Sequence, residues 1–333
     1  MQEQLDELVR YYFEEADYEM EAVPFGLTNL TKIVKLNDRR YVLRIYNRHT
    51  KHVEGIELES RTTSFLVNRE LTFQVPEFLP TLSGDDYVRL SDGSLGAVVV
   101  FLEGTNHVLA NVHDAAEFGR VVGEMSQGLQ QFDRSGLDYQ GISFLDFYNL
   151  HPLADQSAVD AFIENPSFHI PEASLNFYRA KVESVENSVR EIKKLPIQLV
   201  HHDLLIFNLL AQNNRICSVL DFDFISVDTS FLEFAICLNH LLQMSNGSIE
   251  MAEAFVKRYS AYKTHSVQEI EQLRNLTQLY HVAVLHIYIG QHYAGIDIQH
   301  NFTYILNQFI HRDTWLMEHG KTIEWMLIAY IVG

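Results

Sequence analysis

The residues best suited to catalysis lie in the segment 199–223, which reads LVHHDLLIFNLLAQNNRICSVLDFD. Asp203 follows His201 by two positions, Asn208 lies five residues further on, and an Asp-Phe-Asp run begins at Asp221. Separated carboxylates and an amide are groups that phosphoryl transfer uses, because that reaction depends on positioning and on charge neutralisation. We therefore take phosphoryl transfer as the chemistry that this segment could perform.

Each of these groups has a distinct predicted role. One carboxylate must accept a hydrogen bond from the attacking hydroxyl group, and we assign this catalytic role to Asp203. Mg²⁺ prefers hard oxygen ligands, which Asn208 and Asp221 can supply. The order of residues matches the H-x-D-L-x-x-x-N loop and the D-F metal motif of the protein-kinase fold. The alternative is a hairpin that carries surface Asp and Asn residues at its turns.

Apolar pairs flank these motifs and predict the elements that hold them. The pairs lie at residues 199–200, 209–210 and 219–220. Short apolar runs of this kind are consistent with buried strands. The segment is therefore predicted to form a strand, a tight catalytic loop, a second strand, a turn and a third strand, which would hold the loop rigidly.

The first hundred residues are predicted to be rich in strands. Apolar spacing predicts a helix over residues 3–16, and three strands separated by turns at 26–31 and 37–38 follow in residues 23–47. Four residues of the first turn are assigned to the phosphates of a nucleotide: Gly26, Thr28, Asn29 and Thr31. Because the turn has a single glycine, it also suits an ordinary hairpin.

The strand at residues 41–46 carries the predicted cation of the nucleotide site. Arg44 lies where a kinase strand places its phosphate-binding cation, and Val42 is assigned to the same site. Glu57 and Glu59 are the candidate partners of Arg44, and we choose Glu59. Taken alone, Arg44 equally suits a solvent-facing position on a strand, and the two acids suit a solvated helix face.

A helix over residues 53–69 and a hairpin complete the predicted N-terminal region. The hairpin pairs residues 87–90 with 96–102 around Asp92-Gly93, a strong turn signal. Its second strand is apolar throughout and ends in a glycine, which is typical of a hinge whose backbone faces adenine. The residues assigned to this hinge are Phe101, Leu102 and Glu103.

After residue 104 the chain is predicted to be mainly helical. Residues 142–170 are expected to be irregular, with short helical pieces. The predicted helices cover residues 112–132, 174–194, 230–245, 248–264, 266–295 and 301–331. A strand-rich region followed by a helical one predicts an α+β protein of two lobes, with a nucleotide lobe at 1–103 and a catalytic and substrate lobe at 104–333.

Composition indicates which partners and which cellular compartment are expected. The chain has 333 residues, 44 acids and 25 bases, and its net charge of −19 argues against a nucleic-acid partner. Two cysteines provide neither a disulfide framework nor a zinc site, which favours a reducing, cytoplasmic location. The N-terminus lacks the apolar core of a signal peptide, and the apolar run 325–332 is too short to cross a membrane.

The distribution of charge suggests the nature of the acceptor. Residues 1–103 hold 18 acids and 11 bases, a net charge of −7, whereas residues 104–333 hold 26 acids and 14 bases, a net charge of −12. An acidic substrate lobe concentrates cations. The late part of the chain is also rich in aromatic residues, whose faces bind ammonium groups. We therefore expect an acceptor with an amine, such as an aminoglycoside or an amino alcohol.

The chain resembles the aminoglycoside phosphotransferase/choline kinase-like family, which includes homoserine kinase-like enzymes. The resemblance covers about residues 20–325 and is most specific at His201, Asp203, Asn208 and Asp221. It implies a bilobal protein-kinase-like fold, with ATP and Mg²⁺ as cofactors. It implies transfer of the γ-phosphate to a hydroxyl of a small molecule. It further implies Asp203 as the base, Asn208 and Asp221 as metal ligands, and Arg44 on the nucleotide phosphates with Glu59 as its partner.

The catalytic loop departs from the usual family pattern. Loops of this family often read H-G-D-L-H-P-G-N, whereas bulky residues fill four of these positions here: His202, Leu205, Ile206 and Phe207. No catalytic group is removed, but the substrate cannot be transferred by analogy. A homoserine-type or sugar-type kinase and a catalytically silent binding or scaffold protein stay open as alternatives.

Overall fold

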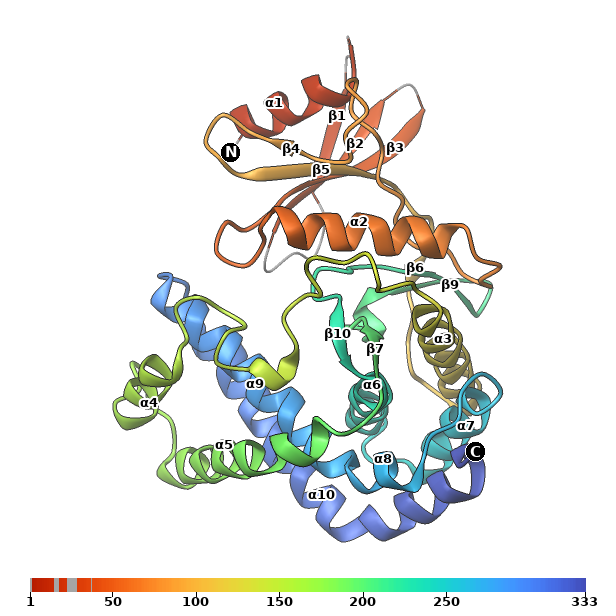
Figure 1. Cartoon of the computed structure of the whole chain (residues 1–333), viewed down its shortest axis with the longest axis vertical. Coiled ribbons are helices and arrows are strands. Elements are labelled where there is room, and N and C mark those ends of the chain that lie inside the picture. Colours follow the sequence, from red (N-terminus) through yellow and green to blue (C-terminus); the bar gives the residue numbers. More distant parts are fainter. Residues whose placement is uncertain (1, 15–17, 23–28, 37) are drawn as a thin grey trace.

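The computed structural model describes residues 2–14, 18–22, 29–36 and 38–333, which form two lobes (Figure 1). The N-terminal lobe is built on an antiparallel sheet with strand order β1-β2-β3-β5-β4. Its strands are β1 (Glu19–Ala22), β2 (Leu30–Leu36), β3 (Arg39–Ile45), β4 (Val88–Arg89) and β5 (Leu95–Val100).

Two helices cover opposite faces of this sheet. Helix α1 (Gln2–Tyr12) packs Leu5 and Leu8 into one apolar cluster, which includes Leu43 of β3. Helix α2 (Val53–Val67) contributes Ile56 to a second cluster, which includes Val42 of β3. Because successive side chains of a strand point to opposite faces, Arg44 lies on the same face as Val42. Helix α2 separates the sheet from the helical lobe (Figure 1).

The C-terminal lobe is mainly helical and contains two small sheets. Strand β7 (Ile197–Val200) pairs with β10 (Ser226–Thr229), and β8 (Leu209–Gln212) lies between β6 (Thr105–Asn106) and β9 (Arg215–Val219). Its helices are α3 (Val112–Gln130), α4 (Gln156–Glu164), α5 (Glu172–Ile192), α6 (Ser230–Met244), α7 (Ile249–Tyr259), α8 (Val267–Glu271), α9 (Leu273–Tyr293) and α10 (Gln299–Ile331).

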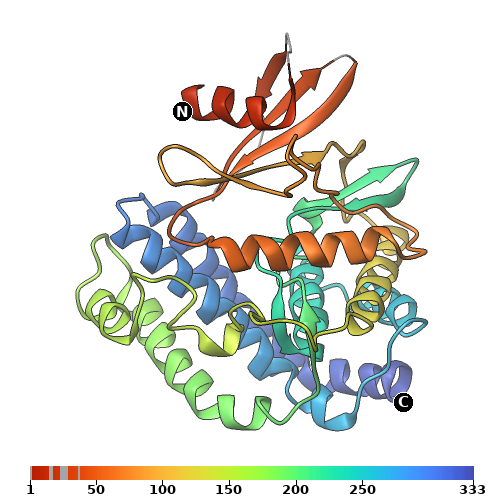
Figure 2. The ribbon, with the colours of Figure 1, turned by 45° about the horizontal axis from the view of Figure 1, so that its top comes forward.

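Two glycines allow α3 and α7 to pack closely, and α3 also contacts a strand of the C-terminal lobe. A Cβ atom on Gly119 would lie 2.2 Å from the Phe255 carbonyl oxygen, and one on Gly123 would lie 2.9 Å from the Tyr259 carbonyl oxygen. Helix α3 in turn contacts β7, because the side-chain amide of Gln198 donates a hydrogen bond of 3.1 Å to the carbonyl oxygen of Ser126. The strand that leads into the catalytic loop is thereby anchored on the helical core. In the turned view of Figure 2, α2 crosses in front of this lobe as a long orange helix.

The structure confirms the predicted fold class and corrects several boundaries. The helix predicted at 3–16 ends at Tyr12, and the one predicted at 266–295 is divided at Gln272, where α8 and α9 meet. Strand β1 precedes the range in which the first strand was predicted. Strands β6 and β10 were not predicted, because segments of two and four residues give little periodic signal.

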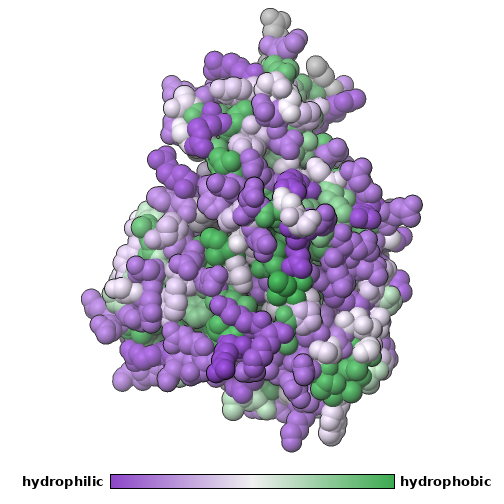
Figure 3. All heavy atoms as spheres, in the orientation of Figure 1, coloured by the Kyte–Doolittle hydropathy of each residue, from purple (hydrophilic) through white to green (hydrophobic). Residues whose placement is uncertain are grey.

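The surface in the view of Figure 1 is mainly hydrophilic, and hydrophobic patches interrupt it near its centre (Figure 3). None of the helices within the described residues combines the length and the apolar character needed to cross a lipid bilayer.

Candidate active site

The catalytic loop connects β7 to β8 through a short 3₁₀ turn at Ile206–Asn208. The Asn208 side-chain nitrogen donates to the Asp203 carbonyl oxygen at 2.9 Å and to its carboxylate Oδ2 at 2.8 Å. Asn208 therefore fixes both the backbone and the carboxylate of Asp203. Within the described part of the chain, the Oδ1 atom of Asn208 accepts no hydrogen bond, so that oxygen is free to bind a ligand.

His201 ties the start of the loop to the segment before the acidic run. Its Nε2 atom lies 3.1 Å from the Leu220 carbonyl oxygen, and its Nδ1 atom accepts a hydrogen bond of 3.2 Å from the Asp203 backbone N–H. One nitrogen donates and the other accepts, which is the pattern of a neutral ring. Burial lowers the pKa of His201 to about 3 and keeps the ring neutral. His201 is therefore a structural support for Asp203.

The acidic run directs Asp221 and Asp223 toward cations of the N-terminal lobe and places Phe222 in the core. Asp221 has a left-handed backbone with φ of 65°, and Phe222 is buried against the His201 ring at a centroid distance of 4.5 Å. Asp221 keeps a side-chain exposure of 39%, whereas that of Asp223 is 11%. The two carboxylates therefore differ in access: Asp221 is open to a ligand and Asp223 is enclosed.

Two cations and three carboxylates meet between the lobes, and we call this group the interlobe ion cluster. Arg44 contacts the Glu59 carboxylate at 2.9 Å and the Asp221 carboxylate at 2.7 Å. Lys51, in the loop between β3 and α2, contacts Glu59 at 2.5 Å. Both cations lie 3.6 Å from the same Oδ1 atom of Asp223. The cluster joins β3 and α2 of one lobe to the acidic run of the other.

The pairing of Arg44 distinguishes the two candidate acids on α2. Glu59 is buried and binds Arg44, whereas Glu57 accepts a hydrogen bond of 3.0 Å from the Tyr87 hydroxyl. Lys51 was not assigned to the site from the sequence, because a lysine in a connecting loop carries no pattern. Asp223 had a signal in the Asp-Phe-Asp run, although only its first acid was assigned to the metal.

Burial and neighbouring charges move the carboxylate pKa values in different directions. Burial raises the pKa of Asp203 well above its ordinary value, and the negative charge of Asp221 adds to this effect. Burial also favours a higher pKa for Asp223, but the charges of Arg44 and Lys51 outweigh it and hold that pKa below its ordinary value. The two cations therefore favour the ionised form of Asp223.

The predicted nucleotide residues are only partly within the described structure. Gly26 and Thr28 lie outside the described residues. Asn29 donates its side-chain N–H to the Asp223 carboxylate and accepts the Asn47 backbone N–H at 3.0 Å. Thr31 is the cross-strand partner of Arg44 and therefore faces the same side of the sheet.

The predicted hinge lies where β5 ends and β6 begins. Phe101, Leu102 and Glu103 follow β5 directly, and the guanidinium of Arg40 lies 4.1 Å from the centre of the Phe101 ring and pairs with Glu103. Gly104 has φ of 148°, and a Cβ atom there would lie 2.8 Å from the Leu210 Cβ atom. Only glycine fits this close approach between the hinge and β8.

The donor set of the site fits a hard divalent cation that also binds phosphate. The free Oδ1 of Asn208 and the exposed carboxylate of Asp221 are the oxygen ligands that Mg²⁺ prefers, and Mg²⁺ commonly takes its other ligands from water and substrate phosphates. The described residues contain no group of three or more His, Cys, Asp or Glu side chains with metal-binding spacing. The predicted metal ligands are therefore one carboxylate and one amide oxygen, and not a cluster of His, Cys, Asp and Glu side chains.

Aromatic side chains pack together near the catalytic loop, where the Phe144 ring stacks on His202 with centroids 4.3 Å apart. Burial raises the pKa values of Tyr280 and Tyr288, and the negative charge of Asp203 adds to this effect. Tyr280 lies nearly parallel to Phe144, with ring centroids 6.5 Å apart, and Phe144 meets Phe224 edge to face at 6.4 Å. These rings form an aromatic wall beside the predicted base.

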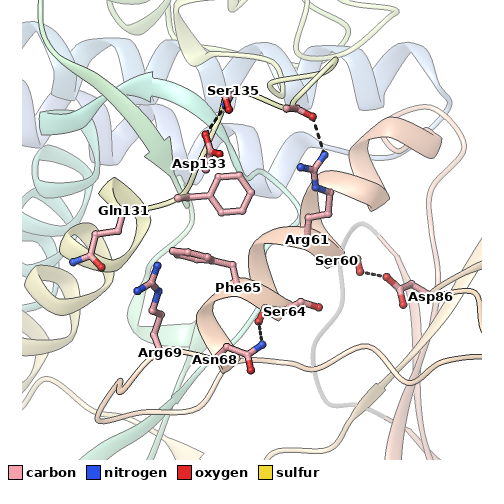
Figure 4. Close-up of a pocket in the computed structure, with 12 residues that line it drawn as sticks. Ser60, Arg61, Ser64, Phe65, Asn68, Arg69, Asp86, Gln131, Asp133 and Ser135 are labelled. Atoms are coloured by element: carbon pink, nitrogen blue, oxygen red, sulfur yellow. Dashed lines mark hydrogen bonds between the residues drawn. The ribbon is translucent and has the colours of Figure 1, made fainter.

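A cavity of about 720 Å³ lies beside α2 (Figure 4). It is lined by α2 and by the chain that follows α3, with Arg69 stacked 4.3 Å above the Phe65 ring and Arg61 bonded to the Gly136 carbonyl oxygen at 3.2 Å. None of the predicted catalytic, metal or nucleotide residues lines it. This cavity is therefore separate from the candidate active site.

Comparison with known proteins places this geometry in a family. Residues 19–274 match the sequence model of the phosphotransferase enzyme family. A homoserine kinase of Rhizobium meliloti (strain 1021) is 24% identical over 282 residues, which cover 80% of this chain and 78% of that enzyme.

Solved structures give the same result for the fold. The amicoumacin kinase hAmiN, solved in complex with AMP-PNP, Ca²⁺ and Ami, has a TM-score of 0.67 at 17% identity, covering 97% of this chain and 92% of that one. A microcompartment-associated aminopropanol kinase has a TM-score of 0.64 at 14% identity, covering 96% of this chain and 98% of that one. The predicted resemblance, the kinase-like fold and the phosphotransferase class of activity are thus confirmed, and the chain belongs to the phosphotransferase enzyme family.

Proposed function

We propose that this phosphotransferase moves the γ-phosphate of ATP to a hydroxyl group of a small amino alcohol, with Asp203 as the catalytic base. The observation that carries the proposal is the arrangement of Asp203. Its carboxylate is held by Asn208 and lies within the electrostatic influence of Asp221, and the aromatic wall packs on His202, the residue directly before it. An acceptor between the wall and the acidic run would therefore meet both the base and the phosphate.

The residues divide the work as follows. Asp203 accepts a hydrogen bond from the acceptor hydroxyl and orients it for attack. Asn208 and Asp221 would hold Mg²⁺, which neutralises phosphate charge when it is bound. Arg44 would exchange its contact with Asp221 for the nucleotide phosphates while it keeps Glu59 as its partner. We also place the lobe boundary between residues 103 and 104, and this is supported by the pairing of β6 with β8 of the second lobe.

The proposed acceptor class rests on charge and on aromatic side chains. The substrate lobe carries a net charge of −12, and Tyr280 and Tyr288 are aromatic residues whose pKa values the charge of Asp203 helps to raise. The relatives are named for homoserine and aminopropanol, and both compounds combine an amine with a hydroxyl group. We therefore place amino alcohols, homoserine included, ahead of aminoglycosides and neutral sugars.

A panel of acceptors tests this proposal. ADP release with ATP and Mg²⁺ would be measured with homoserine, aminopropanol, ethanolamine, choline, an aminoglycoside and a neutral sugar. We expect the highest kcat/KM for an amino alcohol. For the cationic acceptors aminopropanol, ethanolamine and choline, the KM should rise with salt, because screening weakens the binding of a cation. If a neutral sugar is preferred and its KM does not change with salt, the acceptor class is wrong. If ATP–Mg²⁺ stabilises the protein against heat but no acceptor is phosphorylated, the protein is a silent binding module.

Substitution of Asp221 tests the metal site. Asp221→Ala removes the exposed carboxylate, so the affinity for ATP should no longer depend on Mg²⁺. Calorimetric titration of ATP with and without Mg²⁺ measures this dependence. Asp160→Ala, an exposed acid on α4, is the matched control and should bind as the parent does. If Asp221→Ala keeps the full effect of Mg²⁺ on ATP affinity, Asp221 is not a ligand.

A further inference from the structure

His202 occupies an unusual backbone position directly before the predicted base. Its φ is 67°, in the left-handed region that residues other than glycine rarely adopt, and the residue is 1% exposed. Family loops often have glycine here, which adopts this conformation without steric cost. A buried histidine in this conformation therefore needs compensating contacts from its side chain.

The ring of His202 faces oxygen atoms at both of its nitrogens. Nδ1 lies 2.9 Å from the Val200 carbonyl oxygen and 3.0 Å from the Phe224 carbonyl oxygen, and Nε2 lies 3.2 Å from the Asp228 carboxylate. Carbonyl and carboxylate oxygens only accept hydrogen bonds. The ring can satisfy both sides only by donating from both nitrogens, which is the imidazolium form. The side chains of His202 and Asp228 are each 0% exposed, so the pair is sealed from solvent.

Asp228 is itself held from several directions. Its Oδ2 atom accepts hydrogen bonds from the Ser143 hydroxyl at 2.8 Å and the Phe144 backbone N–H at 2.7 Å, and its Oδ1 atom accepts the Thr229 backbone N–H at 2.7 Å. The Phe144 ring also stacks on His202, with centroids 4.3 Å apart. The contacts join β7, β10 and the chain before α4 at one point.

We propose that His202 is a positioning residue that fixes Asp203 relative to the acidic run, a role that rests on the proposed phosphotransfer. The ring follows β7 and precedes the base, and it bonds to the carbonyl oxygen of Phe224, one residue after the Asp-Phe-Asp run. The His202 ring therefore connects the segment of the base to the segment of the predicted metal ligand. The Asp228 carboxylate lies 3.2 Å from the ring, and Glu233 of α6 lies close behind through its bond to the His201 backbone N–H.

The test removes the ring without disturbing the backbone. In His202→Gly, glycine adopts φ of 67° freely, so only the ring contacts are lost. We expect kcat to fall roughly 10–100-fold while the KM values for ATP and acceptor change by less than about threefold, because a misplaced base slows the reaction without removing binding groups. Imidazole at tens of millimolar should enter the vacated space and restore part of kcat.

Three comparisons make the result specific. Asn214→Gly, at a left-handed position of the β8–β9 turn with φ of 60°, is the control for glycine itself and should keep the parent's kcat. Asp203→Asn should show no rescue by imidazole. His202→Asn tolerates the backbone and keeps a single donor, so its kcat should lie between those of the parent and His202→Gly. If His202→Gly does not fold, this second variant decides: a parent-like kcat overturns the proposal.

One readout does not depend on catalysis. In the ¹⁵N NMR spectrum of the parent protein with labelled histidine, both ring nitrogens of His202 should carry protons at neutral pH. The signals are assigned by their absence in His202→Gly. A ring with a single proton, or a kcat in His202→Gly equal to that of the parent, would overturn the positioning role. If no acceptor is phosphorylated by the parent while both ring protons are seen, the proposed function fails. The hydrogen bonds of His202 to Phe224 and Asp228 are then still supported.

Discussion

Charged residues lie on both sides of the catalytic loop, and the two groups are built differently. On the side of the N-terminal lobe, the interlobe ion cluster leaves Asp221 39% exposed and places Asp223 Oδ1 3.6 Å from two cations. Behind the loop, the side chains of His202 and Asp228 are 0% exposed, and Nδ1 of His202 lies 2.9 Å from the Val200 carbonyl oxygen. The difference teaches that the ion cluster keeps one carboxylate within reach of a ligand, whereas the polar pair behind the loop is sealed and can act only through the residues that it touches.

The comparison separates two kinds of effect. Changes in the interlobe ion cluster should alter how nucleotide and metal are handled. Changes behind the loop should alter turnover or the pH dependence of stability with little effect on nucleotide affinity. Asp203 follows His202 directly and is influenced by the charge of Asp221. Because it is also the predicted base, its removal should have the largest effect on turnover.

Asp203→Asn should lower kcat by about 10²–10⁴, the usual range for a general base, while ATP affinity hardly changes. The amide keeps the size of the side chain but loses the charge that orients the acceptor hydroxyl. Steady-state kinetics and calorimetric titration with ATP–Mg²⁺ measure the two quantities. Asp160→Asn on α4 provides an exposed control. Full activity of Asp203→Asn would show that the base lies elsewhere.

Lys51→Met should lower the free energy of unfolding by about 3–5 kcal/mol, because it leaves Glu59 and Asp223 with one cation fewer in a buried site. Denaturant titration measures the loss, and Lys32→Met on β2 is a half-buried control without these contacts. If Lys51→Met is as stable as the control, the contacts of Lys51 contribute no net stability and the cluster depends on Arg44 alone.

Arg44→Ala should raise the KM for ATP roughly 10–100-fold and change the acceptor KM much less, because the proposed partner of the lost charge is the nucleotide phosphates. Arg44→Lys should recover part of the loss, since a point charge remains although the planar fork is gone. Arg39→Ala, exposed on the same strand, is the control. An unchanged KM for ATP in Arg44→Ala would limit Arg44 to joining the two lobes.

Glu233→Gln should change how the stability of the fold depends on pH. Burial raises the pKa of Glu233 from 4.5 to about 7. An acid with a raised pKa stabilises the fold while it is protonated, so this stability is present below about pH 4.5 and is lost as pH rises to about 7. Glutamine does not titrate. Between pH 5 and pH 8 the stability of the variant should therefore improve over that of the parent by about 1–3 kcal/mol.

Thermal unfolding across this pH range gives the measurement for Glu233→Gln. The exposed acid Glu250 on α7 supplies the control, and Glu250→Gln should follow the parent at every pH. A stability difference that does not vary with pH would mean that Glu233 is ionised throughout, with the charge of His202 compensating for burial.

Local spacing predicted the residues of the loop, because one short segment positions them. Asp203 and Asn208 are five residues apart and bond directly, so the spacing determines the contact. Arg44 could be placed because its strand matches the cation-bearing strand of a kinase, whereas spacing left Glu57 and Glu59 both open as its partner. Lys51 could not be placed, since the Asp223 carbonyl oxygen that it contacts lies 172 residues away in the chain. The contacts of His202 were also missed, because a sequence does not show a left-handed backbone.

The contact between Arg44 and Asp221 has a consequence for the order of binding. The guanidinium lies 2.7 Å from the carboxylate that is predicted to bind the metal, so an internal cation already holds that place. A free metal ion must displace it alone, whereas a metal–nucleotide complex offers the arginine new phosphate partners in exchange. We therefore expect the protein to respond to the concentration of the metal–ATP complex and to be nearly insensitive to free metal in the absence of nucleotide.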